Sequence, residues 1–155
     1  MATRRLLVCE RCGPLPATGT LFDDLRARAS GDAGQCPKCH AHHVELRLGF
    51  GFGLNTPDPE STVRDCFIPR QLESWRDEDG SKVTFYPFLV IVQRHGREQA
   101  AWLPYWHTIE KHGRKPAQKY GQWAPFMDLD LFEDLLAQAR AKGYLLGGLA
   151  GPLVA

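Results

Sequence analysis

The sequence predicts an α+β fold in which a metal-binding module, residues 1–54, precedes a small α+β module, residues 61–155. Three observations support this prediction. Two Cys-x-x-Cys pairs occupy the first third of the chain, residues 83–92 are β-branched and aromatic, and a helical apolar periodicity begins near residue 130. Two prolines and several turn-forming residues at 55–60 predict a linker between the two modules.

Short elements are expected to frame the cysteines of the first module. Residues 4–12 are typical of a short strand that runs into a turn. Thr20 and Asp23 form a capping-box pattern, which predicts a helix over residues 21–29. Large apolar residues alternate with glycine and arginine over residues 44–54, which indicates a strand with one nearly bare face.

The second module is predicted to be built around a β-hairpin. Residues 62–68 favour a short strand, and residues 83–92 favour a buried strand with a bulge or sheet edge at Pro87. Charge and a glycine make residues 76–81 typical of a solvated turn. Residues 99–103 are expected to return as the antiparallel partner, so the hairpin would lie at the centre of this module.

The C-terminal part of the chain predicts one amphipathic helix followed by an apolar tail. Asp130 followed by Glu133 predicts the start of the helix, and Gly143 occupies its stop position. Residues 145–155 are uncharged, and burying them against a partner subunit is one way to keep them out of water. The expected apolar face of the helix consists of Leu131, Phe132, Leu135, Leu136 and Ala139.

The spacing of four cysteines predicts a tetrahedral metal site. Two residues separate Cys9 from Cys12, and two separate Cys36 from Cys39, so each pair fits one tight turn that presents both sulfurs to the same ion. Gly13 directly follows the first pair and can take a positive φ there. We predict one structural Zn²⁺ as the occupant, with iron as the alternative because both metals suit four sulfurs.

Residues 8–48, which contain these pairs, resemble a zinc ribbon, also called a rubredoxin-like knuckle pair. In that family, CxxCG and CPxCG hairpins clasp the metal, so the resemblance implies a structural zinc held by the four cysteines. The chain departs from the family pattern at His40, where the second knuckle usually has glycine. It also departs by placing a predicted helix between the two knuckles.

Three histidines, His40, His42 and His43, crowd the second cysteine pair. One of them could in principle replace a cysteine as a ligand. Four well-spaced thiolates already complete the shell, so we expect the histidines to be solvated or to lie outside it. A completed shell also argues against catalysis at the metal, because catalytic zinc keeps one position open.

Composition and charge exclude several classes of protein. The 155 residues carry 19 basic and 18 acidic side chains, so the chain as a whole lacks the field of a protein that coats nucleic acid. The sequence contains no apolar run long enough to cross a membrane and no signal-peptide core, which predicts a cytoplasmic protein. Five cysteines in a reducing compartment favour metal ligands over a disulfide framework, with Cys66 left over.

A local basic and aromatic segment, residues 105–123, is the best binding candidate outside the cysteine module. Lysine or arginine could contact phosphates while tryptophan or tyrosine stacks on bases. The alternative is a long loop that its aromatic residues anchor to its own domain. The candidate nucleic-acid or partner surface comprises Trp106, Lys111, Arg114, Lys115, Lys119, Tyr120 and Trp123.

The predicted function is that of a non-catalytic zinc-binding protein, which acts as an interaction or structural subunit of a larger complex. Its partner would be another protein or a second copy of the chain. The alternatives are a nucleic-acid-binding protein that uses residues 105–123 and a small enzyme with an unrecognised site. We assign no catalytic residue, because no recognised nucleophile or acid–base motif contains the remaining candidates: Asp65, Cys66, His107, Glu110 and His112.

Overall fold

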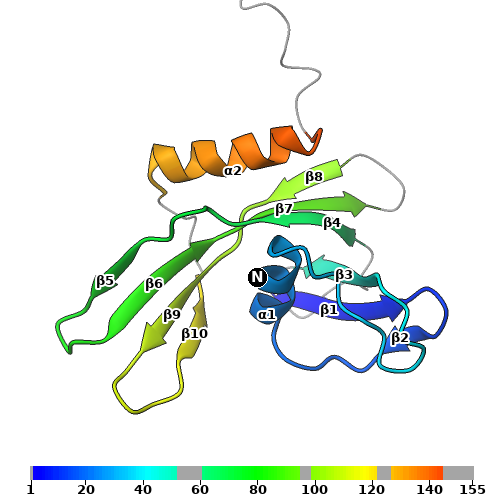
Figure 1. The fold of residues 1–155 in the computed structure, drawn as a ribbon, viewed down its shortest axis with the longest axis horizontal. Helices are drawn as coiled ribbons and strands as arrows, with labels where there is room; N and C mark the ends of the chain where they lie inside the picture. Colours follow the sequence, from blue (N-terminus) through cyan, green and yellow to red (C-terminus); the bar gives the residue numbers. More distant parts are fainter. Residues whose placement is uncertain (1, 52–60, 95–98, 122–126, 145–155) are drawn as a thin grey trace, which may run out of the picture.

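The computed structural model describes residues 2–51, 61–94, 99–121 and 127–144, which form two antiparallel sheets and two helices (Figure 1). No helix in this part of the chain is both long and apolar enough to cross a membrane. The elements are β1 (Ala2–Cys9), β2 (Gly13–Leu15), α1 (Leu21–Ala29), β3 (Val44–Gly51), β4 (Ser61–Phe67), β5 (Ser74–Arg76), β6 (Lys82–Pro87), β7 (Leu89–Arg94), β8 (Gln99–Trp102), β9 (Tyr105–Glu110), β10 (Ala117–Tyr120) and α2 (Leu129–Ala141).

The larger sheet contains six strands in the order β2-β1-β3-β4-β7-β8. Its central pairing joins β3 to β4, with Arg47 opposite Thr62. The two strands lie on either side of the predicted linker, residues 55–60, which is itself outside the described residues. The two predicted modules therefore share one sheet.

The apolar stretch predicted as one strand, residues 83–92, is two strands in two different sheets. β6 ends at Pro87, whose nitrogen carries no hydrogen to extend a ladder. Phe88 is fully buried between the sheets and donates its backbone N–H to Pro104 O at 2.9 Å, and β7 then enters the six-stranded sheet. The predicted bulge at the proline is thus a crossing from one sheet to the other.

The predicted hairpin is confirmed as β7 paired with β8, with Ile91 opposite Ala101. Its expected place at the centre of a separate module is wrong, because β8 forms one edge of the six-stranded sheet. The residues predicted as a solvated turn, 76–81, begin in a short strand, β5, and turn through residues 77–80.

The smaller sheet contains four strands in the order β10-β9-β6-β5 and presents different side chains on its two faces. Cross-strand partners lie on the same face, because side chains alternate along each strand. One row consists of Tyr86, Trp106 and Tyr120, on the face toward α1. Trp75 pairs with Val83 on the opposite face.

Helix α1 begins where the sequence predicts. Thr20 Oγ1 accepts the backbone N–H of Asp23 at 3.2 Å, and Asp23 Oδ2 accepts the backbone N–H of Thr20 at 3.1 Å. This reciprocal capping box satisfies two backbone donors that the first turn leaves free. The side chains of Phe22 and Leu25 are buried, so α1 packs at the junction of the two sheets.

Helix α2 covers the part of the six-stranded sheet formed by β4 and β7 (Figure 1). It begins after Asp128, two residues earlier than predicted, and the backbone there is extended. Leu135 and Ala139 from the predicted apolar face are fully buried. Gly143 follows the helix with a φ of 80°, which confirms its stop position.

A mostly buried ion pair fastens β1 to α1. Arg5 Nη1 lies 2.6 Å from Asp24 Oδ2, and the two side chains are 14% and 16% exposed. Arg5 Nη2 also donates to Gly19 O at 2.8 Å. Burial raises the pKa of the Asp24 carboxyl, whereas Arg5 opposes that shift.

We expect Arg5→Met to lower the free energy of unfolding by about 3 kcal/mol at neutral pH, because it leaves a buried carboxylate without its cation. The substitution also raises the pKa of Asp24 further in the folded state. The folded state then holds the Asp24 proton more tightly than the unfolded state does. Such a protein loses stability as pH rises from the ordinary carboxyl pKa, about 4, toward the raised pKa of the folded state.

The free energy of unfolding that Arg5→Met loses relative to the unchanged protein should therefore become smaller as pH is lowered toward about 5. Urea titrations of both proteins at each pH give this difference, and effects common to both cancel. Arg47→Met is the matched control, because its pair with Glu45 is 41% and 43% exposed and should contribute about 1 kcal/mol or less. A deficit that grows on acidification would contradict the assignment.

Candidate metal centre

Two tight turns present the four cysteines to one point. The first turn lies between β1, which ends at Cys9, and β2, which begins at Gly13, and these two residues are cross-strand partners. Gly13 has a φ of 75°, as predicted from its place after the first pair. The second turn follows α1 and is closed by two backbone bonds of Cys36, whose N–H donates to Ala41 O and whose carbonyl accepts the N–H of His40, both at 2.9 Å.

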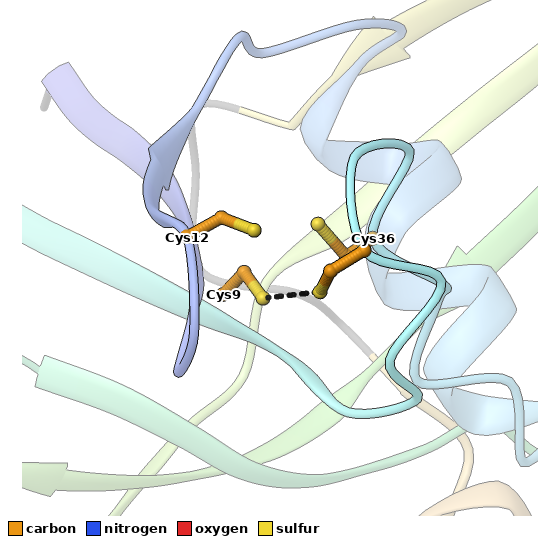
Figure 2. Close-up of side chains that lie close together, drawn as sticks. Cys9, Cys12 and Cys36 are labelled. Atoms are coloured by element: carbon orange, nitrogen blue, oxygen red, sulfur yellow. Dashed lines mark hydrogen bonds between the residues drawn. The ribbon is translucent and has the colours of Figure 1, made fainter.

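The four sulfurs are brought together as the spacing predicts. In Figure 2 the side chains of Cys9 and Cys12 point from the first turn toward Cys36 on the facing loop. The ligand atoms of Cys9, Cys12, Cys36 and Cys39 all lie within 4.8 Å of one another. The sulfurs of Cys9 and Cys39 are 3.5 Å apart, and all four thiols are free.

These separations fit a tetrahedron of thiolates. Four sulfurs at about 2.3 Å from a central zinc lie roughly 3.8 Å from each other. This separation falls between the 3.5 Å of Cys9 and Cys39 and the 4.8 Å that bounds all the pairs. A disulfide would need a sulfur separation of about 2.05 Å, well below that of Cys9 and Cys39. The geometry therefore suits a metal ion better than a pair of disulfides.

Burial divides the four cysteines into an inner and an outer pair. Cys9 and Cys36 are 2% and 0% exposed, whereas Cys12 and Cys39 are half-buried. A small apolar cluster that includes Leu15 and Val44 surrounds the inner pair. This cluster is separate from the main core beneath α1.

Backbone N–H groups stabilise negative charge on the second turn. The pKa of the Cys36 thiol is lowered to about 6, chiefly because the backbone N–H of Cys39 donates to its sulfur, with a smaller contribution from Lys38. The pKa of Cys12 is raised to about 12, first by the neighbouring thiol of Cys39 and then by burial. Several thiolates this close repel one another, and a dication offsets that repulsion.

The three histidines near the second turn do not belong to this cluster. His40, His42 and His43 are exposed, and among the described residues the four cysteines are the one group of potential ligands that converges in this way. His40 and His43 have φ values of 57° and 75°, in the left-handed region. His40 thus adopts the conformation for which the zinc-ribbon pattern places glycine.

Replacing His40 with glycine should stabilise the protein by about 0.5–1 kcal/mol, because glycine adopts a positive φ without steric cost. His42 is exposed and its φ is not positive, so His42→Gly is the matched control and should give no gain. Thermal denaturation with excess zinc measures both variants. A His40→Gly variant that is less stable than the unchanged protein would contradict a purely conformational effect.

The structure divides the predicted partner surface among different environments. The prediction that Trp106 belongs to this surface is wrong, because Trp106 is 6% exposed and packs in the main core. Tyr120 is 39% exposed and lies beside it, with ring centroids 5.0 Å apart. Lys119 lies on the opposite face of the four-stranded sheet, and Trp123 is outside the described residues.

The remaining basic residues of that predicted surface lie at the turn between β9 and β10. All three, Lys111, Arg114 and Lys115, are exposed, and Lys111 Nζ is 3.0 Å from Asp79 Oδ2. Trp75, on β5, is 43% exposed and belongs to the same face as Lys119, although the sequence did not indicate it. The alternating face of a three-residue edge strand becomes evident only once its pairing register is known.

Three of the side chains considered for catalysis, Asp65, Cys66 and His107, make contacts within the fold. Cys66 is buried, and burial raises its pKa, so it is a poor nucleophile. Both carboxylate oxygens of Asp65 accept hydrogen bonds from Lys142 Nζ, each at 3.0 Å. His107 packs against the rings of Trp75 and Tyr105, and burial lowers its pKa.

Comparison with known proteins adds no assignment to these observations. No protein-family model matches the sequence, and no match was found among the curated proteins or the solved structures. The cysteine cluster is therefore the feature on which a functional proposal can be based.

Proposed function

We propose that the chain is a zinc-binding protein in which Cys9, Cys12, Cys36 and Cys39 hold one structural Zn²⁺. We further propose that it acts as a non-catalytic interaction or structural subunit of a larger complex. The observation that carries the metal assignment is the convergence of four free thiols within 4.8 Å. Such a set fills all four positions of tetrahedral zinc, which leaves none open for water or substrate.

The metal would supply stability that this part of the fold otherwise lacks. The apolar cluster around the inner cysteines is small, with Leu15 and Val44 as its buried non-cysteine members. Small clusters bury too little apolar surface to order the two cysteine turns, and structural zinc contributes folding free energy directly. Zinc therefore takes the place of a larger core between the two turns.

The subunit role is supported by exposed apolar side chains. Leu129, Trp75, Tyr120 and Leu103 are 75%, 43%, 39% and 38% exposed. Exposed aromatic side chains such as Trp75 and Tyr120 are typical anchors of protein interfaces. The nearly neutral total charge of +1 also suits association with another protein.

Purification of the tagged full chain from its own cells tests both parts of the proposal. Metal analysis should find one zinc per chain, and a coloured iron form would identify the alternative metal. Size-exclusion chromatography should show a complex larger than the 17.4 kDa chain. A monomer without partners would overturn the subunit role and leave the zinc assignment intact, whereas a metal-free complex would do the reverse.

A further inference from the structure

We infer that the free end of the four-stranded sheet binds single-stranded nucleic acid. Trp75 and His107 would provide stacking surfaces, and Arg114, Lys115 and Lys119 would contact phosphates. The turns between β5 and β6 and between β9 and β10 project away from α2 and from the region of β1–β3 (Figure 1). This surface is separate from the cysteine cluster, so the inference does not rest on the metal.

The aromatic part of this surface lies on the sheet face opposite α1. Trp75 is opposite Val83, and His107 is opposite Phe85, so pairing register places both rings on that face. Their ring centroids are 5.7 Å apart with an interplanar angle of 78°. The indole N–H of Trp75 donates to Asp77 Oδ1 at 3.0 Å, which helps to hold the exposed ring in place.

The basic part of the surface adjoins these rings. Lys119 is opposite His107 on the same face, and Arg114 and Lys115 lie in the turn that follows β9. A cavity of about 450 Å³ at this end is lined by all three cations and Lys111, together with two acidic residues, Asp77 and Asp79. The three cations make no ion pair within the described part of the chain, so their charge is available to a ligand.

Two of the acidic residues nearby, Asp77 and Asp79, accept hydrogen bonds within the fold. Asp79 Oδ1 accepts the backbone N–H of Ser81 at 2.9 Å, and its other oxygen pairs with Lys111. These contacts lower the pKa of Asp79, with the bonds from Ser81 as the largest cause. Over residues 74–84 and 107–119, six basic residues face four acidic ones, which leaves a modest positive excess.

This combination favours single-stranded nucleic acid over an acidic peptide or a duplex. The modest positive excess attracts a polyanion only weakly, so the exposed ring of Trp75 and the half-buried ring of His107 must contribute to affinity. Unpaired bases stack on aromatic side chains with about 1–3 kcal/mol per base, whereas a duplex keeps its base faces covered. An acidic peptide would use the cations but would gain little from Trp75.

The experiment is fluorescence anisotropy of labelled single strands of about 20 nucleotides, one of DNA and one of RNA, titrated with the full zinc-loaded chain at about 50 mM salt. Three phosphate contacts predict that log K falls against log salt with a slope of about −2. Trp75→Ala should weaken binding roughly 5- to 100-fold with the slope unchanged. The combined variant R114Q/K115Q/K119Q should abolish most of the salt dependence.

Two matched controls distinguish the site from general effects. Trp75→Phe keeps an aromatic ring and should retain most of the affinity. R64Q/R70Q/R140Q removes the same charge from exposed positions elsewhere and should leave binding nearly unchanged. Circular dichroism verifies that each variant is folded. Three results would overturn the inference. These are no binding to either strand, an affinity that Trp75→Ala does not change, and an equal affinity for polyglutamate. The DNA and RNA arms identify the preferred strand.

Discussion

Cys36→Ser should weaken zinc binding by more than the roughly 100-fold that the loss of an outer-shell partner costs. Serine has nearly the same size as cysteine, but its hydroxyl remains protonated near neutral pH and cannot replace the thiolate. Cys36 is fully buried, and backbone N–H groups of its own turn already stabilise its negative charge. A ligand that the fold prepares in this way cannot be replaced by a neighbouring side chain without moving the loop.

Competition with a chromophoric chelator measures the affinity, and circular dichroism follows the structure as zinc is removed. Cys66→Ala is the matched control, because Cys66 is also buried but lies in the main core, outside the sulfur cluster. That variant should bind zinc as tightly as the unchanged protein. Stoichiometric zinc at unchanged affinity in Cys36→Ser would show that the four-cysteine assignment is wrong.

Phe22→Ala should lower the free energy of unfolding by about 3–5 kcal/mol, which is among the largest effects available to a single core truncation. Phe22 is 1% exposed and lies at the point where α1 meets both sheets. Its ring centroid is 5.1 Å from that of Tyr86, 5.9 Å from that of Phe88 and 5.8 Å from that of Trp106. Removing the ring leaves a cavity that three other aromatic side chains cannot fill without moving both sheets.

Urea denaturation in excess zinc measures this loss while keeping the metal site saturated. Phe22→Leu retains most of the volume and should cost about 1.5 kcal/mol or less. Thr20→Ala removes the cap at the start of the same helix and should lower the free energy of unfolding by about 1 kcal/mol, which gives a second value for comparison. A Phe22→Ala variant as stable as Phe22→Leu would contradict the position of α1 between the sheets.

Features determined by neighbouring residues could be predicted from the sequence. The helix over residues 21–29 follows from the Thr20 and Asp23 capping box, and the two cysteine turns follow from their spacing, because each interaction closes within a few residues. The end of α2 at Ala141, just before the positive φ of Gly143, is likewise determined by nearby residues. Its start was less clear, since the N-cap residue, Asp128, makes no side-chain cap bond.

The assignment of strands to sheets depends on partners distant in the sequence. Residues 83–92 are apolar throughout, so their pattern cannot show that the chain changes sheets at Phe88. The pairing of β3 with β4 likewise joins segments on either side of a proline-rich stretch that favours a boundary. Local composition indicates a linker there, whereas the shared sheet depends on backbone hydrogen bonds that composition does not encode.

The candidate binding surface shows the same limit at the level of single side chains. Trp106 and Lys119 belong to one basic and aromatic segment, but strand alternation places them on opposite faces of the sheet. The first is buried in the core and the second is exposed. Charge and aromatic content identify the segment, and only the register determines which residues a ligand could contact.

X-ray absorption at the zinc edge on the purified full chain tests the central claim most directly. The account predicts one zinc whose nearest neighbours are four sulfurs at about 2.3 Å, with no shorter shell. A shell of nitrogen or oxygen at about 2.0–2.1 Å would show that a histidine or water has replaced a cysteine, and absence of zinc at stoichiometric level would contradict the metal centre itself.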